Sequence, residues 1–312
     1  MYPYLKKGTS NPIETGEKNI MNATTIAANS AQSTLEMINF LTENIINAET
    51  PGYNGKRFTF RDYLYGGTIE DAGRSWRQGK QQVRVGEPTK MMLKGKGFFT
   101  VLNPENNEIV YTRLGDFHFD KNGYLTSTEG FLVLGTPLQS NLQPLGNSKY
   151  NKLGPKFEFD IFADPLSNPS KRNYPNVGSG QEAGKPQPVN LGMDPTNGLY
   201  LGKYEKLRID KSGIIWGKYG DSEVSLYKIT TRNFQNLNGL KQFRGNYWKE
   251  TSESGPPLPC NALVLNEALE QSNVWTKVEV DYVIEAQRQY AAAINSHKVA
   301  DRLVQQAIEL VG

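Results

Sequence analysis

Apolar residues near the start of the chain recur at helical spacing. Between Asn22 and Ala48 there is neither glycine nor proline, and the apolar side chains follow one another every three or four residues. This period predicts an amphipathic helix over residues 22–48. We expect it to end before Thr50-Pro51-Gly52, because proline disfavours helical geometry at the preceding residue and glycine accepts a positive φ. The expected apolar face comprises Ala27, Ala31, Leu35, Ile38, Leu41 and Ile45.

The end of the chain carries a second, longer helical pattern. Residues 273–311 also lack glycine and proline. A helix of this length would extend about 60 Å, far more than an average helix of about a dozen residues. We therefore expect it to pack along another long helix, as in a coiled coil. Its apolar band comprises Val280, Ile284, Ala291, Ile294, Val299, Leu303, Ala307 and Leu310.

Between these helices the pattern changes to short alternating runs separated by turns. Paired runs at 97–102 and 109–113, at 117–119 and 124–126, and at 207–209 and 214–216 each predict a hairpin. The second and third share an Asp-Lys-polar-Gly turn. The predicted fold class is α+β, in which long N- and C-terminal helices pair as a coiled-coil-like layer and enclose a β-rich middle domain with an insertion.

The same pattern sets the expected domain boundaries. Residues 136–200 contain nine prolines and many glycine, asparagine and serine residues, which indicates an insertion. Both a solvated loop and a binding surface remain open for it. The expected segments are a polar N-terminal extension (1–21), a terminal helical domain (22–48 and 273–312), linkers (49–93 and 253–272) and a β-rich outer domain (94–252).

Charge and hydropathy exclude several classes of protein. The 35 basic and 32 acidic residues leave a net charge of +3, so we expect no nucleic-acid partner. No apolar stretch reaches the roughly 18 residues of a membrane span, so we expect no segment that crosses a membrane. The N-terminus has two lysines without an apolar segment behind them, and we expect no cleaved signal peptide.

The sequence offers little catalytic chemistry. One cysteine, Cys260, cannot close an intrachain disulfide, and His118 and His297 cannot form a histidine-rich metal site. Neither histidine has a nucleophile and a carboxylate at a recognisable spacing. We therefore expect no enzyme, no cofactor and no metal. His118 should point to solvent or to an adjacent strand, because it alternates with Phe117 and Phe119.

Two short loops resemble ligand-binding motifs without satisfying them. Gly95-Lys-Gly97 lacks the spacing and the Ser/Thr of a phosphate-binding loop. Asp120-Lys-Asn122 has two calcium-loop positions, but Tyr124 and Leu125 stand where an oxygen ligand and a glycine are needed. We interpret the second loop as a hairpin turn.

The terminal helices are the feature of the sequence that points to a function, because their apolar faces need to be covered. Each is too long or too apolar to be stable alone. Neighbouring copies of the chain could cover their apolar faces. A helical hairpin that packs within the chain on the β domain is the alternative.

At this point several segments resemble a known family. Residues 44–53 read Asn-Ile-Ile-Asn-Ala-Glu-Thr-Pro-Gly-Tyr. This closely resembles the Asn-x2-Asn-x2-Thr-Pro-Gly-Tyr/Phe signature that follows the first helix of bacterial flagellar rod and hook proteins. The signature residues, which we expect to form a turn, are Asn44, Asn47, Thr50, Pro51, Gly52 and Tyr53. Segments 94–99, 111–125, 130–135, 269–274 and 285–290 agree in order with further marks of the family.

The resemblance implies a structural subunit of the flagellar basal-body rod, most similar to the FlgG and FlgF type. It implies terminal helices that resemble a coiled-coil inner tube, an outer β layer, and a periplasm-spanning location. The implied partners are copies of the chain itself, other rod and hook proteins, and the flagellar type III export apparatus. A hook-type axial protein is one alternative. A secreted β-rich glycan-binding module or hydrolase is another, from a different class.

Overall fold

The computed structural model describes residues 12–61, 68–138, 184–195, 201, 204–219, 222–260 and 262–311. These residues form two compact units. The helical unit comprises the residues up to Ala48, Gly55–Ser75, and those from Val274 onward. The β unit comprises Glu49–Asn54 and Trp76–Asn273. The class is α+β, as the sequence predicts.

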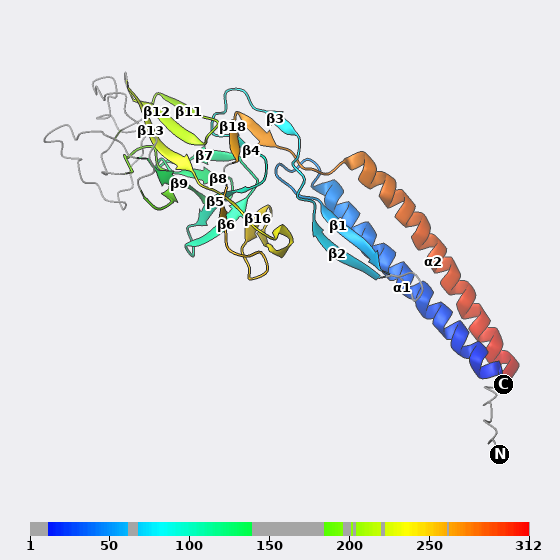
Figure 1. The fold of residues 1–312 in the computed structure, drawn as a ribbon. Helices are drawn as coiled ribbons and strands as arrows, with labels where there is room; N and C mark the ends of the chain where they lie inside the picture. The colour runs from blue at the N-terminus through cyan, green and yellow to red at the C-terminus, as the bar shows by residue number, and fades with distance from the viewer. Residues whose placement is uncertain are drawn as a thin grey trace, which may run out of the picture. The chain divides into compact units, whose positions relative to one another are not determined.

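The helical unit consists of two long helices and one hairpin. Helix α1 spans Pro12–Ile46 and helix α2 spans Thr276–Val311, and the two lie side by side (Figure 1). Strands β1 (Lys56–Arg61) and β2 (Thr68–Arg74) pair antiparallel and pack on α1. No helix among the described residues is long and apolar enough to cross a membrane.

The helix boundaries differ from the predicted ones. Helix α1 begins at Pro12 rather than Asn22. Proline is favoured in the first turn, where its missing N–H is not needed, and Gly16 inside the helix costs only about 1 kcal/mol. Helix α2 begins at Thr276 rather than Asn273. The side chain of Asn273 is engaged elsewhere, since its Nδ2 donates to the carbonyl oxygen of Arg77.

The β unit is built from antiparallel strands. Its main sheet has the order β11-β12-β13-β9-β5-β6-β16-β15 among the described residues, with β7, β8, β10, β14 and β17 attached to it. Two short pairs, β18 with β4 and β19 with β3, join segments far apart in the sequence. The strands are β3 (Gln81–Val83), β4 (Met91–Lys94), β5 (Phe98–Asn103), β6 (Glu108–Thr112), β7 (Phe117–Phe119), β8 (Leu125–Ser127), β9 (Leu132–Pro137), β10 (Gln187–Pro188), β11 (Lys206–Ile209), β12 (Ile214–Tyr219), β13 (Ser222–Ile229), β14 (Thr231–Asn233), β15 (Lys241–Arg244), β16 (Tyr247–Lys249), β17 (Leu258–Pro259), β18 (Leu263–Asn266) and β19 (Ala268–Glu270), and one 3-10 turn covers Leu237–Gly239.

The three predicted hairpins are confirmed as β5–β6, β7–β8 and β11–β12. Two of their turns share one chemistry. Asp120 Oδ1 accepts the backbone N–H groups of Asn122 and Tyr124, and Asp210 Oδ1 accepts those of Ser212 and Ile214. The carboxylate thus closes an Asx turn in each loop, and the following glycine has a positive φ.

Strands also occupy the stretches predicted to be linkers. Residues 49–93 contain β1, β2, β3 and most of β4, and residues 253–272 contain β17, β18 and β19. Strands β1 and β2 pair with each other, whereas β3 and β4 pair with β19 and β18, far along the chain, which local alternation does not indicate. Of the predicted insertion, residues 139–183 and 196–200 lie outside the described residues.

Two apolar clusters form the core of the β unit. The larger one contains buried side chains from most strands of the main sheet, among them Phe99, Val101 and Ile215. The smaller one is aromatic: Phe98, Tyr111, Phe234 and Trp248 pack with Trp76 in edge-to-face geometry. Most large aromatic residues of the described β unit are therefore internal.

Candidate assembly interface

The face that α1 buries is rotated slightly from the predicted one. Of the predicted residues, Ala27, Ala31 and Leu41 are buried and Ile38 and Ile45 are half-buried, but Leu35 is 42% exposed. This rotation places small and hydrogen-bonding side chains in the buried face of α1. Ser33, Thr34, Met37 and Asn44 complete the buried set.

Helix α2 packs on α1 through a different stripe from the predicted apolar band. Its buried and half-buried positions follow one another at alternating intervals of four and three residues, the spacing of a heptad seam. Ala286 packs with Met37 and Leu41 of α1, which places the seam against that helix. The seam residues are Glu279, Val283, Ala286, Tyr290, Ala293, His297, Ala300 and Val304.

The predicted apolar band of α2 lies mainly outside this seam. Val280, Ile284, Val299 and Leu303 are among the exposed large hydrophobic side chains. Ala291 is also exposed, and Ile294 is half-buried beside the seam. Ala307 and Leu310 belong to α2, but their side chains lie outside the described ones.

The exposed apolar residues of α2 fall into two groups, one on each side of the seam. One residue along a helix corresponds to a rotation of about 100°. Members of the preceding flank stand one position before a seam position, and members of the following flank stand one position after it. The preceding flank comprises Val278, Tyr282, Val299 and Leu303, and the following flank comprises Val280 and Ile284.

A polar stripe separates the two flanks on the side opposite the seam. All its members are exposed and none is apolar. Helix α2 therefore exposes apolar side chains on two sides, where they alternate with polar residues such as Glu285, Gln289, Lys298 and Asp301. The stripe consists of Asp281, Arg288, Asn295, Arg302 and Glu309.

The predicted motif turn begins with a buried asparagine. Asn44 is 1% exposed. Its Oδ1 accepts the backbone N–H of Lys56 at 2.7 Å, and its Nδ2 donates to the carbonyl oxygen of Lys56 at 3.1 Å and to Glu279 Oε2 at 3.2 Å. Asn44 therefore joins the end of α1, the start of β1 and the first turn of α2. Asn47 donates to the carbonyl oxygen of Glu43 through both its Nδ2 and its backbone N–H, near the end of α1.

The rest of the motif belongs to the β unit. Gly52 has a φ of 68°, and its N–H donates to the carbonyl oxygen of Glu270 at 2.8 Å. A Cβ at this position would lie 2.9 Å from the backbone nitrogen of Leu114, so glycine is required. The Thr50 carbonyl accepts the N–H of Tyr53, which is buried, and the Pro51 carbonyl accepts Nδ2 of Asn246.

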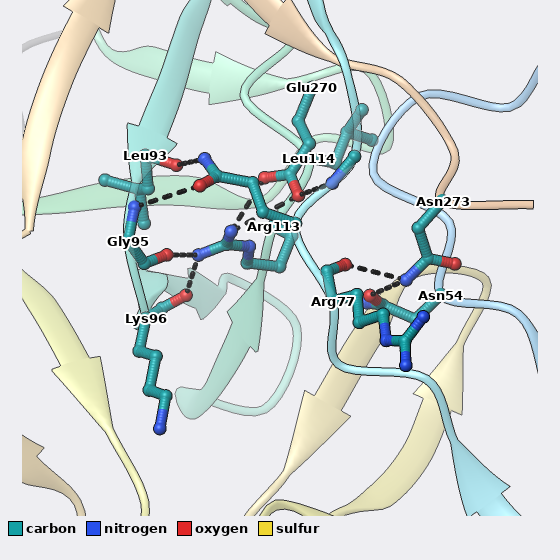
Figure 2. Close-up of polar contacts among 12 residues, drawn as sticks. Asn54, Arg77, Leu93, Gly95, Lys96, Arg113, Leu114, Glu270 and Asn273 are labelled. Carbon is teal, nitrogen blue, oxygen red and sulfur yellow. Dashed lines mark hydrogen bonds and ion pairs between the residues drawn. The ribbon is translucent and has the colours of Figure 1, made fainter.

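A buried ion pair lies next to this turn (Figure 2). Arg113 Nη1 donates to the carbonyl oxygens of Gly95 and Gly97, and Nη2 lies 3.0 Å from Glu270 Oε2. Glu270 Oε1 also accepts the N–H of Gly79 at 2.9 Å. Because the carbonyl groups of the Gly95–Gly97 loop point at a cation, this loop is not an anion cradle, as the sequence indicates.

Burial affects the pKa of two acidic side chains near the motif, Glu270 and Glu279. Burial raises the pKa of Glu270 above its ordinary value, and Arg113 and the N–H of Gly79 oppose that shift. Burial likewise raises the pKa of Glu279, against the hydrogen bond from Asn44. Both carboxyl groups thus depend on neighbouring donors to remain charged inside the protein.

Comparison with known proteins agrees with these motifs. The family described as the flagellar hook protein FlgE/F/G D1 domain matches residues 92–161. The chain is 24% identical to the flagellar basal-body rod protein FlgG of Caulobacter vibrioides, over 93% of this chain and 99% of that protein. It is 24% identical to FlgG of Buchnera aphidicola subsp. Acyrthosiphon pisum, over 88% and 93% respectively. The chain is thus similar to flagellar rod and hook proteins, and to the rod protein FlgG over nearly its whole length.

A hook protein matches a smaller part of the chain. The flagellar hook protein FlgE of Escherichia coli is 30% identical over 39% of this chain and 32% of its own length. The rod proteins therefore share a far larger part of the chain than the hook protein does. These likenesses support a structural subunit of the flagellar axis.

The residues outside the motifs take structural places. His118 is exposed and its ring Nε2 lies 3.3 Å from Thr126 Oγ1 on the adjacent strand, as predicted. His297 lies in the α2 seam, 3.6 Å from Asp301. Cys260 donates from Sγ to the carbonyl oxygen of Lys96. No group of three metal-ligating side chains occurs in the described part of the chain.

Sequence reasoning missed Arg113, Glu270 and Asn273 as functional positions. Each lies in a segment that resembles the family: Arg113 within 111–125, and Glu270 and Asn273 within 269–274. Their place within these segments was the signal that could have singled them out.

Proposed function

We propose that this chain is a subunit of the flagellar basal-body rod, which polymerises through its terminal helices into an axial tube that transmits torque for motility. The two exposed apolar flanks of α2 carry this proposal. A filament requires heterologous contacts, in which one face of a subunit meets a different face of its neighbour. A helix with two apolar flanks and a polar stripe between them offers such a pair of faces.

The energetics favour burial of these flanks in an assembly. Covering a partly exposed large apolar side chain contributes about 1–2 kcal/mol at about 25 cal/mol per Å². Seven such side chains on α2 therefore supply on the order of 10 kcal/mol per subunit, before the entropic cost of association. The seam toward α1 contains mostly alanine and polar residues, so pairing within the chain leaves the larger apolar residues uncovered.

The heptad spacing of the α2 seam supports coiled-coil pairing of α1 and α2 in the assembled rod. On this proposal the predicted apolar residues of both helices, Ala27 to Ile45 and Val280 to Leu310, divide between that seam and contacts with neighbouring copies. Other rod and hook proteins are the further partners. The location is the periplasm-spanning basal body, reached through the flagellar type III export apparatus.

A rod position is preferred over a hook position because the rod relatives cover more of the chain. A glycan-binding module would need exposed aromatic residues on the β unit. Among its described residues, Phe243 is the exposed large aromatic side chain, and Lys249 lies over its ring. A sugar platform therefore has little support.

Two substitutions test the proposal, one on each flank. Leu303→Gln changes the preceding flank and Ile284→Gln the following flank. We expect each variant to fold and be produced normally but to be depleted from isolated basal bodies at least tenfold. Asn295→Ala, on the polar stripe, is the matched control and should be incorporated normally. Normal incorporation of both flank variants would contradict assembly through α2.

A further inference from the structure

The β unit contains a hollow lined by cationic and hydroxyl side chains. Its volume is about 540 Å³, within the range of about 300–1,000 Å³ that is common for binding sites. Among the described residues that line it, Lys211, Lys228 and Arg232 are positively charged and none is acidic. The hollow therefore favours an occupant with negative charge.

Strand pairing brings the polar part of this lining together. Lys228 lies opposite Thr136 in the β13–β9 pair, so the two side chains stand on the same face of the sheet. Thr136 Oγ1 is 3.4 Å from Thr230 Oγ1. The ammonium group of Lys228 thus stands beside two hydroxyl groups, which can donate hydrogen bonds to an anion.

An apolar side chain borders these charges. Leu263 of β18 lines the hollow and is 47% exposed. The N–H of the next residue, Val264, donates to the carbonyl oxygen of Lys211 at 3.0 Å, which holds the β11–β12 turn against β18. Asp210 is engaged within that turn, since its Oδ1 accepts the hydroxyl of Ser212 and two backbone N–H groups. A matching occupant carries carboxylates next to an apolar side chain.

The β5–β6 turn has this composition. Each of its residues from Pro104 to Ile109 is exposed. Glu105 and Glu108 supply two carboxylates, and Ile109 is 48% exposed. Glu108 already pairs with Lys249, so a further cation gains most from Glu105. The turn is thus a projecting element whose charge and apolar side chain complement the hollow.

The turn and the hollow lie at opposite ends of β5. Arg232, which lines the hollow, pairs with Phe98 at the start of β5, whereas the turn follows Asn103 at its end. At about 3.3 Å per residue these two ends are roughly 15 Å apart. Contact between turn and hollow therefore requires two copies of the chain. It uses a different face of each copy, which is the heterologous contact that a filament needs.

We propose that the hollow receives the β5–β6 turn of a second copy, with Glu105 against Lys211 and the neighbouring cations and Ile109 against Leu263. This contact adds to those of the α2 flanks, and it rests on the proposed polymerisation of the chain. Opposite charges on the two faces favour one register between the copies. Contact also removes two exposed aliphatic side chains from water.

Cysteine cross-linking tests this contact. Ile109→Cys and Leu263→Cys, combined in a Cys260→Ser background, retain every charge of the two faces. A short bifunctional maleimide is applied to isolated basal bodies and to the concentrated purified chain. We expect a ladder of multimers from the double-cysteine chain, because each copy offers one thiol to each of two neighbours. The two single-cysteine chains are the controls and should give no ladder.

Charge reversal tests the recognition in the same double-cysteine background. Lys211→Glu and Glu105→Lys should each lower the cross-linked fraction at least threefold, and the two together should restore it. Lys121→Glu is the matched control, because Lys121 holds the same position in the other Asp-Lys-polar-Gly turn, away from the hollow. It should leave the cross-linked fraction unchanged. Equal urea midpoints show that the variants are folded.

Three results would overturn the contact. They are the absence of a ladder in both preparations, single reversals without effect, and a double reversal that does not restore cross-linking. A ladder in basal bodies supports the contact and the rod assembly together.

The remaining outcomes separate this contact from the proposed function. If the ladder forms only in the concentrated chain, the contact stands and assembly into the rod fails. If Leu303→Gln and Ile284→Gln are depleted from basal bodies while no ladder forms, assembly through α2 stands and only the contact of the β units is wrong.

Discussion

Replacing Arg113 by methionine should destabilise the β unit strongly. The guanidinium is 7% exposed and its partner Glu270 is 4% exposed, so Arg113→Met leaves a carboxylate buried without its cation and two carbonyl groups without a donor. Breaking a buried pair by removing one partner costs about 3–5 kcal/mol. At a slope of about 2–3 kcal/mol per M of urea, the midpoint should fall by about 1–2 M.

Tryptophan fluorescence during urea unfolding measures this loss. In a Trp275→Phe background the remaining tryptophans, Trp76, Trp216 and Trp248, all lie in the β unit. Glu270→Gln is the second arm of a double-mutant cycle. Because the amide removes the buried charge, the double variant should be more stable than Arg113→Met alone by about 1–3 kcal/mol.

The pH dependence supplies an independent check on the same pair. Glu270 has a raised pKa in the folded protein, so the folded state binds its proton at a higher pH than the unfolded state does. The stability gained by protonation is present below the unfolded-state pKa and is lost as the pH rises through the folded-state pKa. Without Arg113 the pKa should rise further, and the deficit of Arg113→Met should shrink as the pH falls from 7 toward 4. A deficit below 1 kcal/mol at pH 7, or one that grows on acidification, would refute the reasoning.

Three further substitutions test the turn and the helix contact, each by unfolding of the free chain. Gly52→Ala should cost about 2–4 kcal/mol, from a φ of 68° and the close backbone of Leu114, whereas Gly86→Ala has open space and should cost only about 1–2 kcal/mol for its positive φ. Leu41→Ala should cost about 2–5 kcal/mol, measured by far-ultraviolet circular dichroism, while the exposed Leu35→Ala should cost less than 1 kcal/mol. Asn44→Asp should cost about 1–3 kcal/mol, and less at pH 4 than at pH 7, because it sets a second carboxylate beside Glu279; equal costs at both pH values would contradict this.

Local rules account for the parts of the fold that the sequence predicts. Helix α1 ends near Thr50-Pro51-Gly52, and Asp120 and Asp210 close their hairpins, because each depends on neighbours within a few residues. Strand pairs such as β3 with β19 join residues nearly two hundred positions apart. No local period specifies such pairs, so the predicted linkers proved to contain strands.

The packing face of α2 was not predicted because large aliphatic residues dominate a hydropathy pattern. Val280 and Ile284 indicate an apolar face, yet the contact with α1 uses Ala286, Ala293 and Ala300. Their spacing of seven residues was the available signal for a close helix contact. In the same way, Arg113 and Glu270 lie 157 positions apart, and only the fold brings them together.

The central claim is that the two apolar flanks of α2 are covered by neighbouring subunits in the rod. Leu303→Cys and Ile284→Cys, each in a Cys260→Ser background, place one thiol on each flank. Maleimide labelling of the free chain and of isolated basal bodies measures whether these positions are covered. The account predicts rapid labelling of the free chain and at least tenfold slower labelling in basal bodies at both positions. Equal labelling rates in the two states would contradict it.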